Sequence, residues 1–135
     1  MNNELAQSFL LKASITAARW QTASWQIKTA QSAAAAEPSL DLDIAQWQQT
    51  AETDRTNAIE SARRAVREFE KSSRDLNRNW TVAAQAAAAH DLLAWLESPA
   101  HRETAISNYE ASIKGRESEP FAHPFVDRLN QLKSR

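Results

Sequence analysis

Apolar residues recur every three or four positions along most of this chain, which is the spacing that gathers them on one side of an α-helix. β-Branched residues never alternate with polar ones over the length of a strand, so the pattern predicts an all-α fold. We expect a single helical domain, residues 1–135, built as a bundle of four to five helices of which the first two are long. The expected helices span about residues 3–36, 41–78, 80–97, 99–114 and 124–133.

The first expected helix carries two apolar stripes. The first stripe comprises Phe9, Ala13, Ala17, Trp20 and Ile27. The second stripe comprises Leu11, Ile15, Ala18, Thr22 and Trp25. Trp20 and Trp25 are five positions apart, which is a rotation of about 140° on a helix, so the two indoles cannot share a face.

The second stripe has two interpretations. Either both stripes pack inside the bundle, or the second stripe faces a partner chain while the first faces the bundle. Exposed together, Leu11, Ile15 and Trp25 would form an apolar patch of the kind that marks an interaction site, and tryptophan is enriched in such sites. The candidate protein-binding residues are therefore Leu11, Ile15, Trp25 and Trp20.

The second expected helix is capped by Ser39 or Asp41. Its apolar residues occupy a single arc and are Ile44, Trp47, Ala51, Ala58, Ala62, Phe69, Leu76 and Trp80. Asn77 and Asn79 are poor helix residues, and asparagine suits the left-handed backbone of a helix C-cap. We expect the helix to end near residue 78, with one continuous rod to residue 97 as the alternative.

Residues 80–96 are apolar on nearly every side of a helix and carry Asp91 as their only formal charge, which is typical of an interior helix. The next expected helix, residues 99–114, has clear start and stop signals. Ser98 is the expected cap, Pro99 takes the first helical position and Gly115 lies just beyond the end. A final helix with a short apolar stripe follows Pro124.

The second expected helix also carries a basic row. It consists of Arg64, Arg67, Lys71, Arg74 and Arg78, which fall within an arc of about 80° that points away from the core. Acidic residues are interleaved, and Glu60–Arg64 and Glu70–Arg74 have the spacing of favourable ion pairs. We interpret the row as a solvated, ion-paired face, with an acidic protein surface or nucleic acid as alternative partners. The helix is mostly acidic before residue 60 and mostly basic after it, which suits antiparallel pairing with a second copy.

Composition narrows the functional classes. The net charge of −1 argues against bulk attraction to nucleic acid or an anionic membrane. The absence of cysteine excludes disulfides, thiolate metal sites and a cysteine nucleophile. The N-terminal residues lack the basic start and long apolar core of a secretory signal, and no segment is suited to cross a membrane. We expect a soluble, cytoplasmic protein.

Candidate chemistry is sparse. His90, His101 and His123 are scattered, and no metal-binding, phosphate-loop or nucleophile motif is present. Glu97 and His101 are four positions apart but straddle Ser98-Pro99, so we expect them not to share a helix face. His90 is interpreted as a hydrogen-bonded core or boundary histidine. The sequence thus predicts no catalytic residue, no metal and no cofactor.

Arg116 and His123 are separated by six residues, which resembles the Arg-x(4–6)-His signature of the all-helical HEPN ribonuclease superfamily. The resemblance covers eight residues and the fold class. Pro120 interrupts the spacing, whereas the family's motif lies around the start of a continuous helix. The resemblance implies that Arg116 and His123 cleave RNA; from the residues themselves, they are a loop arginine and a helix-capping histidine.

These observations favour a non-enzymatic protein–protein interaction module. We expect a small accessory, adaptor or inhibitor protein of the bacterial or phage type, which acts through the tryptophan-containing face of the first helix and associates with itself. The alternatives are a nucleic-acid-binding protein that uses the basic row, and a HEPN-like ribonuclease.

Overall fold

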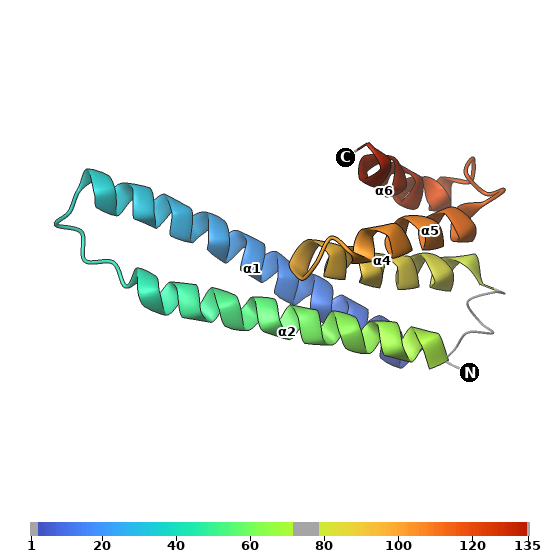
Figure 1. Ribbon diagram of the computed structural model, residues 1–135, viewed down its shortest axis with the longest axis horizontal. Helices are drawn as coiled ribbons and strands as arrows, with labels where there is room; N and C mark the ends of the chain where they lie inside the picture. The colour runs from blue at the N-terminus through green and yellow to red at the C-terminus, as the bar shows by residue number, and fades with distance from the viewer. Residues whose placement is uncertain (1–2, 72–78, 135) are drawn as a thin grey trace.

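Two long antiparallel helices, α1 (Glu4–Ala36) and α2 (Ile44–Lys71), form a hairpin that runs the length of the molecule (Figure 1). The computed structural model describes residues 3–71 and 79–134. Over these residues the chain forms five α-helices, one short 3-10 helix and no strand, which confirms the all-α fold. None of the described helices combines the length and apolar character that a membrane crossing requires.

α2 begins later than a cap at Ser39 or Asp41 predicts, because Asp43 is the residue that caps it. The Asp43 carboxylate accepts a hydrogen bond from the backbone N–H of Gln46 at 3.1 Å. Residues 72–78, and with them the predicted positions of Arg74, Leu76, Asn77 and Arg78, lie outside the described residues.

Small side chains line the contact between α1 and α2. The buried alanines of these two helices are Ala6, Ala13, Ala17 and Ala30 on α1, and Ala51, Ala58, Ala62 and Ala65 on α2. Ala13 packs in one cluster with Ala62, and Ala17 in the next with Ala58, which sets the register of the hairpin. The buried alanines of α2 include a seven-residue repeat, the repeat of a coiled coil, and their size lets the helices approach closely.

The hairpin extends beyond the later helices (Figure 1). We call residues 23–52 its outer part, because none of them belongs to a core cluster with α4, α5 or α6. Within it only Ile27, Ala30 and Ala51 are buried. Trp47 lies on the predicted core arc of α2 but remains exposed, because no third helix covers this end. An ion pair between Arg19 and Asp54, at 3.1 Å, joins the two helices at the base of the outer part.

α4 (Trp80–Leu96) is a separate helix, so the break expected near residue 78 is confirmed. Of the two asparagines considered for a C-cap, Asn77 lies outside the described residues. Asn79 has an extended backbone and caps the start of α4, where its side chain accepts hydrogen bonds from the N–H groups of Thr81 and Val82 at 3.0 and 3.4 Å. α4 packs against α1, α2 and α5, as its all-round apolar surface predicts.

α5 (His101–Ile113) and α6 (His123–Lys133) complete the bundle on the far side of α4, with a 3-10 turn at Pro120–Ala122 between them. Ser98 caps the turn before α5 by accepting the N–H of Ala100, so α5 starts later than a cap at Ser98 predicts. Gly115 lies beyond the end of α5 with a φ of +82°, a backbone conformation that glycine adopts without strain.

Candidate functional site

The second apolar stripe of α1 lies on the surface of the molecule. We call it the outer stripe; it comprises Leu11, Ile15, Ala18, Thr22 and Trp25, and every member is exposed. Leu11 is 61% exposed, Ile15 53% and Trp25 67%. The outer stripe points away from Ala13 and Ala17, which are fully buried against α2 and α4. The chain's own helices therefore leave this stripe uncovered.

The first stripe of α1 forms the packed face of the helix. All of its members, Phe9, Ala13, Ala17, Trp20 and Ile27, are buried or half-buried. Trp20 packs edge-on against Trp95 of α4, with the ring centroids 5.3 Å apart. Trp20 and Trp25 thus lie on different faces of α1. Trp20 belongs to the packed face and is not part of the exposed set of candidate protein-binding residues.

A cleft of about 320 Å³ opens beside the outer stripe, between α1, α4 and α6. Leu10 and Ser14 of α1 line it on one side; both flank Leu11 on the helix surface. Leu92 and the half-exposed Trp95 line it from α4. The cleft has no local signal in the sequence, because helices that are far apart in the chain build it.

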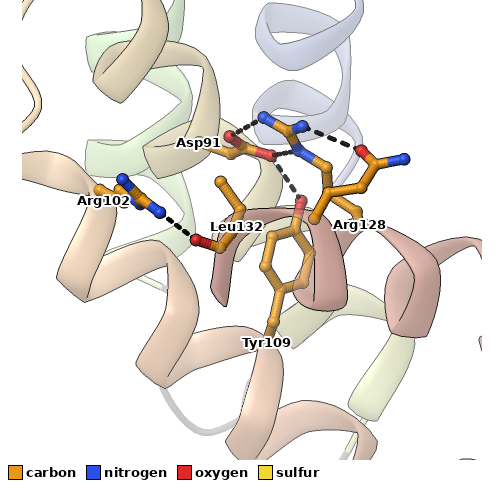
Figure 2. A network of polar contacts seen from close by, with 6 residues as sticks. Asp91, Arg102, Tyr109, Arg128 and Leu132 are labelled. Carbon is orange, nitrogen blue, oxygen red and sulfur yellow. Dashed lines mark hydrogen bonds and ion pairs between the residues drawn. The ribbon is translucent and has the colours of Figure 1, made fainter. Parts of the chain in front are cut away.

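An ion pair between the buried Asp91 and the half-buried Arg128 holds α6 against α4 at the far wall of this cleft (Figure 2). Both oxygens of Asp91 accept hydrogen bonds from the guanidinium of Arg128, at 2.6 and 2.8 Å. The Tyr109 hydroxyl of α5 lies 3.5 Å from the same carboxylate. Asp91, the lone charge of an apolar helix, thus forms a bidentate ion pair with Arg128.

The electrostatics of this network follow from burial and hydrogen bonding. The hydrogen bonds to Asp91 raise the pKa of Arg128, and burial together with the nearby Asp91 carboxylate raises the pKa of Tyr109 far above its usual value. Arg102 adds a second link by donating to the backbone carbonyl of Leu132 (Figure 2). The Asp91–Arg128 and Arg102–Leu132 contacts join α6 to α4 and α5, and the Tyr109–Asp91 contact joins α5 to α4, which is a structural role.

The basic row is only partly available for partners. Arg64 and Lys71 both donate to Glu68, at 2.9 and 3.1 Å, and these bonds lower the pKa of the Glu68 carboxyl. The predicted Glu60–Arg64 pair is wrong, because Arg64 turns toward Glu68 and packs over the ring of Phe9. Arg74 and Arg78 lie outside the described residues.

A second cleft, of about 350 Å³, lies over α1 and α2 at the basic row. Phe9 and Lys12 line it from α1, and Glu60, Arg63, Arg64 and Arg67 line it from α2. Neither Lys12 nor Arg67 makes an ion pair with another described residue. The row is accordingly a mixture of paired and free cations, with Glu60 among them.

Glu97 and His101 share one site, which corrects the expectation that Ser98-Pro99 would separate them. His101 Nε2 lies 3.0 Å from Glu97 Oε1, because the turn at residues 98–100 keeps the two side chains on the same side. Arg63 of α2 also binds Glu97, so this carboxylate links α2 to the start of α5. The Arg63–Glu97 contact spans 34 positions, and spacing alone could not reveal it.

His90 lies beside this site, with its ring centroid 6.5 Å from that of His101. It is a boundary residue as predicted, but its buried Nδ1 has no hydrogen-bond partner among the described residues, which corrects the expected hydrogen bonding. Burial lowers the pKa of His90, the charge of His101 lowers it further, and Glu70 opposes the shift.

Acidification is therefore expected to destabilise the protein through His90. Its pKa is lower in the folded chain than the unfolded value of about 6.5, so below that pH the unfolded chain binds the proton more tightly. The contribution of neutral His90 to the free energy of unfolding is complete above about pH 6.5 and falls as the pH drops toward the folded-state pKa of His90. Urea midpoints of the wild type and of His90→Gln between about pH 7.5 and 5.5 measure this.

We expect His90→Gln to show a smaller loss of stability on acidification than the wild type. The control is His123→Gln, which removes an exposed histidine at the start of α6 and should keep the wild-type pH dependence. Equal pH dependence in all three proteins would contradict the assignment to His90.

Arg116 and His123, the pair that resembles the HEPN signature, make separate contacts. Arg116 lies in the loop after α5, 3.9 Å from Glu119, with its guanidinium over the ring of Trp80. His123 is the first residue of α6 and is exposed. Within residues 3–71 and 79–134 no hydrogen bond or ion pair joins Arg116 to His123, and no group of three histidine, aspartate or glutamate side chains is placed to hold a metal ion.

Comparison of the chain with protein-family models, curated proteins and solved structures finds no match.

Proposed function

We propose that this protein is a non-enzymatic interaction module that binds another protein chain through the outer stripe of α1. The observation that carries the proposal is the exposure of Leu11, Ile15 and Trp25 on one face of a regular helix. Between residues 11 and 25 this face extends for about 21 Å and contains no charged side chain. An apolar line of this kind, with a tryptophan at one end, is typical of a protein-binding surface.

The stripe has no evident role in the stability of the chain itself. A second set of apolar residues on α1 already packs against α2 and α4, so folding does not require the outer one. Exposed leucine, isoleucine and tryptophan on one line are a liability for aggregation unless a partner covers them. The small size of the domain and the exposed line suit an accessory, adaptor or inhibitor protein, which acts by docking.

The described charges favour protein binding over nucleic-acid binding. Arg64 and Lys71 are both engaged by Glu68, and Glu60 lies among the remaining cations of the row. A phosphate backbone requires unpaired cations, because binding releases counterions in proportion to the phosphates that are neutralised. The basic row is thus better suited to orient a protein partner.

The test compares capture of protein partners by three forms of the tagged chain in its native host. In the first variant, Leu11→Ser with Trp25→Ser, two members of the outer stripe become polar. In the control, Leu40→Ser with Phe121→Ser, two exposed apolar residues outside the stripe are changed; Leu40 is 45% exposed and Phe121 83%. We expect the wild type and the control to retain the same chains, whether a second copy or another protein, and the stripe variant to lose them.

Urea unfolding of the three proteins separates binding from folding. Exposed positions contribute little to stability, so both double variants should unfold near the wild-type midpoint. Unchanged capture by the stripe variant would overturn the proposal. So would a large drop in its unfolding midpoint, since the residues would then be part of the core.

A further inference from the structure

The outer stripe has the spacing of a coiled-coil seam. Its five members follow one another at steps of four, three, four and three residues, the alternation that places two apolar residues in each heptad. Such a seam keeps to one narrow line on the helix surface, and a line of this width is covered by a single helix that brings a seam of its own. A sheet edge or an irregular loop has no apolar residues at that period. The spacing of the stripe therefore favours a helix as its occupant.

Charged side chains flank the outer stripe on both sides, and all of them are cationic. Lys12 and Arg19 lie about 80–100° from the middle of the stripe on the side toward α2, and Lys28 lies about 100° from it on the other side. In a coiled coil these flanking positions meet the charged residues of the partner helix. Residues 5–36, which make up nearly all of α1, contain no acidic residue. A partner therefore meets a line of apolar side chains between two basic margins.

Two of these three cations have no ion-pair partner among the described residues. Lys12 and Lys28 are both exposed and unpaired in this part of the chain. Lys12 opens onto the cleft over α2, whose lining also holds Arg67, likewise unpaired among the described residues, and Glu60. Arg19 has an ion-pair partner on α2, yet its side chain is 65% exposed. Exposed cations beside an apolar line favour a partner that carries acidic side chains beside its own apolar line.

We propose that the outer stripe binds an acidic amphipathic helix of another protein, with apolar residues at a heptad spacing and aspartate or glutamate on both flanks. This inference rests on the proposed function and names the class of its partner. A second copy suits the surface less well, because its own stripe would bring the same cations against Lys12, Arg19 and Lys28. Like charges on the two sides of a seam disfavour pairing, whereas opposite charges select the partner.

The cleft between α1, α4 and α6 gives one large side chain of that helix a place to insert. Ser14, which lines the cleft, lies one turn from Leu11 on the flank of the stripe. Leu92 and Trp95 form an apolar wall opposite, and the cleft has a volume of about 320 Å³. A helix that lies on the outer stripe therefore passes the mouth of this cleft. An aromatic or aliphatic anchor in a pocket is typical of protein interfaces.

Two synthetic peptides, each about 21 residues long, test the charge requirement. Both carry leucine at the two seam positions of each heptad; the acidic peptide has glutamate on both flanks of the seam and the basic peptide has lysine there. Like charges on its flanks keep each peptide from pairing with itself. We expect the wild-type chain to bind the acidic peptide, and to bind the basic peptide about tenfold more weakly or less. Fluorescence anisotropy of the dye-labelled peptides measures both, and added salt should weaken binding of the acidic one.

Reversing the charges beside the stripe supplies the second half of the test. Lys12→Glu with Lys28→Glu should invert the preference, so that the basic peptide binds more tightly than the acidic one. Both positions are exposed, and circular dichroism should show an unchanged fold. The matched control, Lys114→Glu with Lys133→Glu, makes the same change in net charge at exposed lysines outside the stripe and should keep the wild-type preference. Absence of acidic-peptide binding to the wild type, or an unchanged preference in the Lys12→Glu with Lys28→Glu protein, would overturn the proposal.

Capture in the native host distinguishes failure of this inference from failure of the proposed function. Suppose that Leu11→Ser with Trp25→Ser abolishes capture, but the captured chain is a second copy or is still retained by Lys12→Glu with Lys28→Glu. The outer stripe then remains a docking site and its partner is not an acidic helix. If capture does not depend on Leu11 and Trp25, both proposals are overturned.

Discussion

Replacing Phe69 by alanine is expected to lower the free energy of unfolding by about 3–5 kcal/mol, the range for a buried aromatic residue. Phe69 is 1% exposed and lies where α1, α2 and α4 meet. Its buried neighbours are mainly alanines, including Ala6 and Ala65, whose side chains have no rotamers with which to fill the space. The cavity should therefore persist and the loss should fall in the upper part of the range.

Urea unfolding followed by circular dichroism measures this loss. The matched control is Phe121→Ala, which removes the same atoms from a side chain that is 83% exposed and should change stability by about 0.5 kcal/mol or less. A Phe69→Ala protein as stable as the Phe121→Ala protein would contradict the packing described for the three-helix junction.

Breaking the Asp91–Arg128 pair is the second change with a large expected effect. Asp91→Ala leaves the Arg128 guanidinium without its carboxylate in a site that is only partly open to water. Removing one partner of a fully buried pair costs about 3–5 kcal/mol, and the partial exposure of Arg128 reduces the expected loss to about 2–3 kcal/mol. The measurement is again the free energy of unfolding in urea.

A double variant distinguishes the pair from the packing around it. Asp91→Leu with Arg128→Leu removes both charges and should recover most of the stability that Asp91→Ala loses, because no charge remains unpaired. Tyr109→Phe should cost about 1 kcal/mol or less, since its hydroxyl lies at the limit of hydrogen-bond distance from Asp91. A double variant that is less stable than Asp91→Ala would show that the ion pair is not the main link between α4 and α6.

The helices were predictable because their signals are local. Periodicity placed α1, α4 and the start of α2 to within a few residues, and the alanine-rich character of residues 80–96 indicated an interior helix. Caps were harder, because several polar residues near a helix start compete for one role. Asp43 caps the start of α2 in place of Ser39 or Asp41, and Asn79 caps the start of α4.

The features of the structure that could not be predicted from the sequence depend on contacts between residues far apart in the chain. Asp91 was visible as an isolated charge, but Arg128, 37 positions away, could not be assigned to it by spacing. The exposure of the outer stripe was likewise undecided, because Leu11 and Trp25 have the same periodicity as the packed stripe. Only the position of α4 on the other side of α1 shows which stripe remains uncovered.

The outer part of the α1–α2 hairpin has a consequence for how this fold can diversify. Its two helices contact one another and extend past the rest of the chain (Figure 1). Matched insertions or deletions of seven residues in both helices would preserve the alanine register and leave α4, α5 and α6 unchanged. Each such step alters the reach of the hairpin by about 10 Å. The length of the hairpin can thus change in evolution without a change in the packing of α4, α5 and α6.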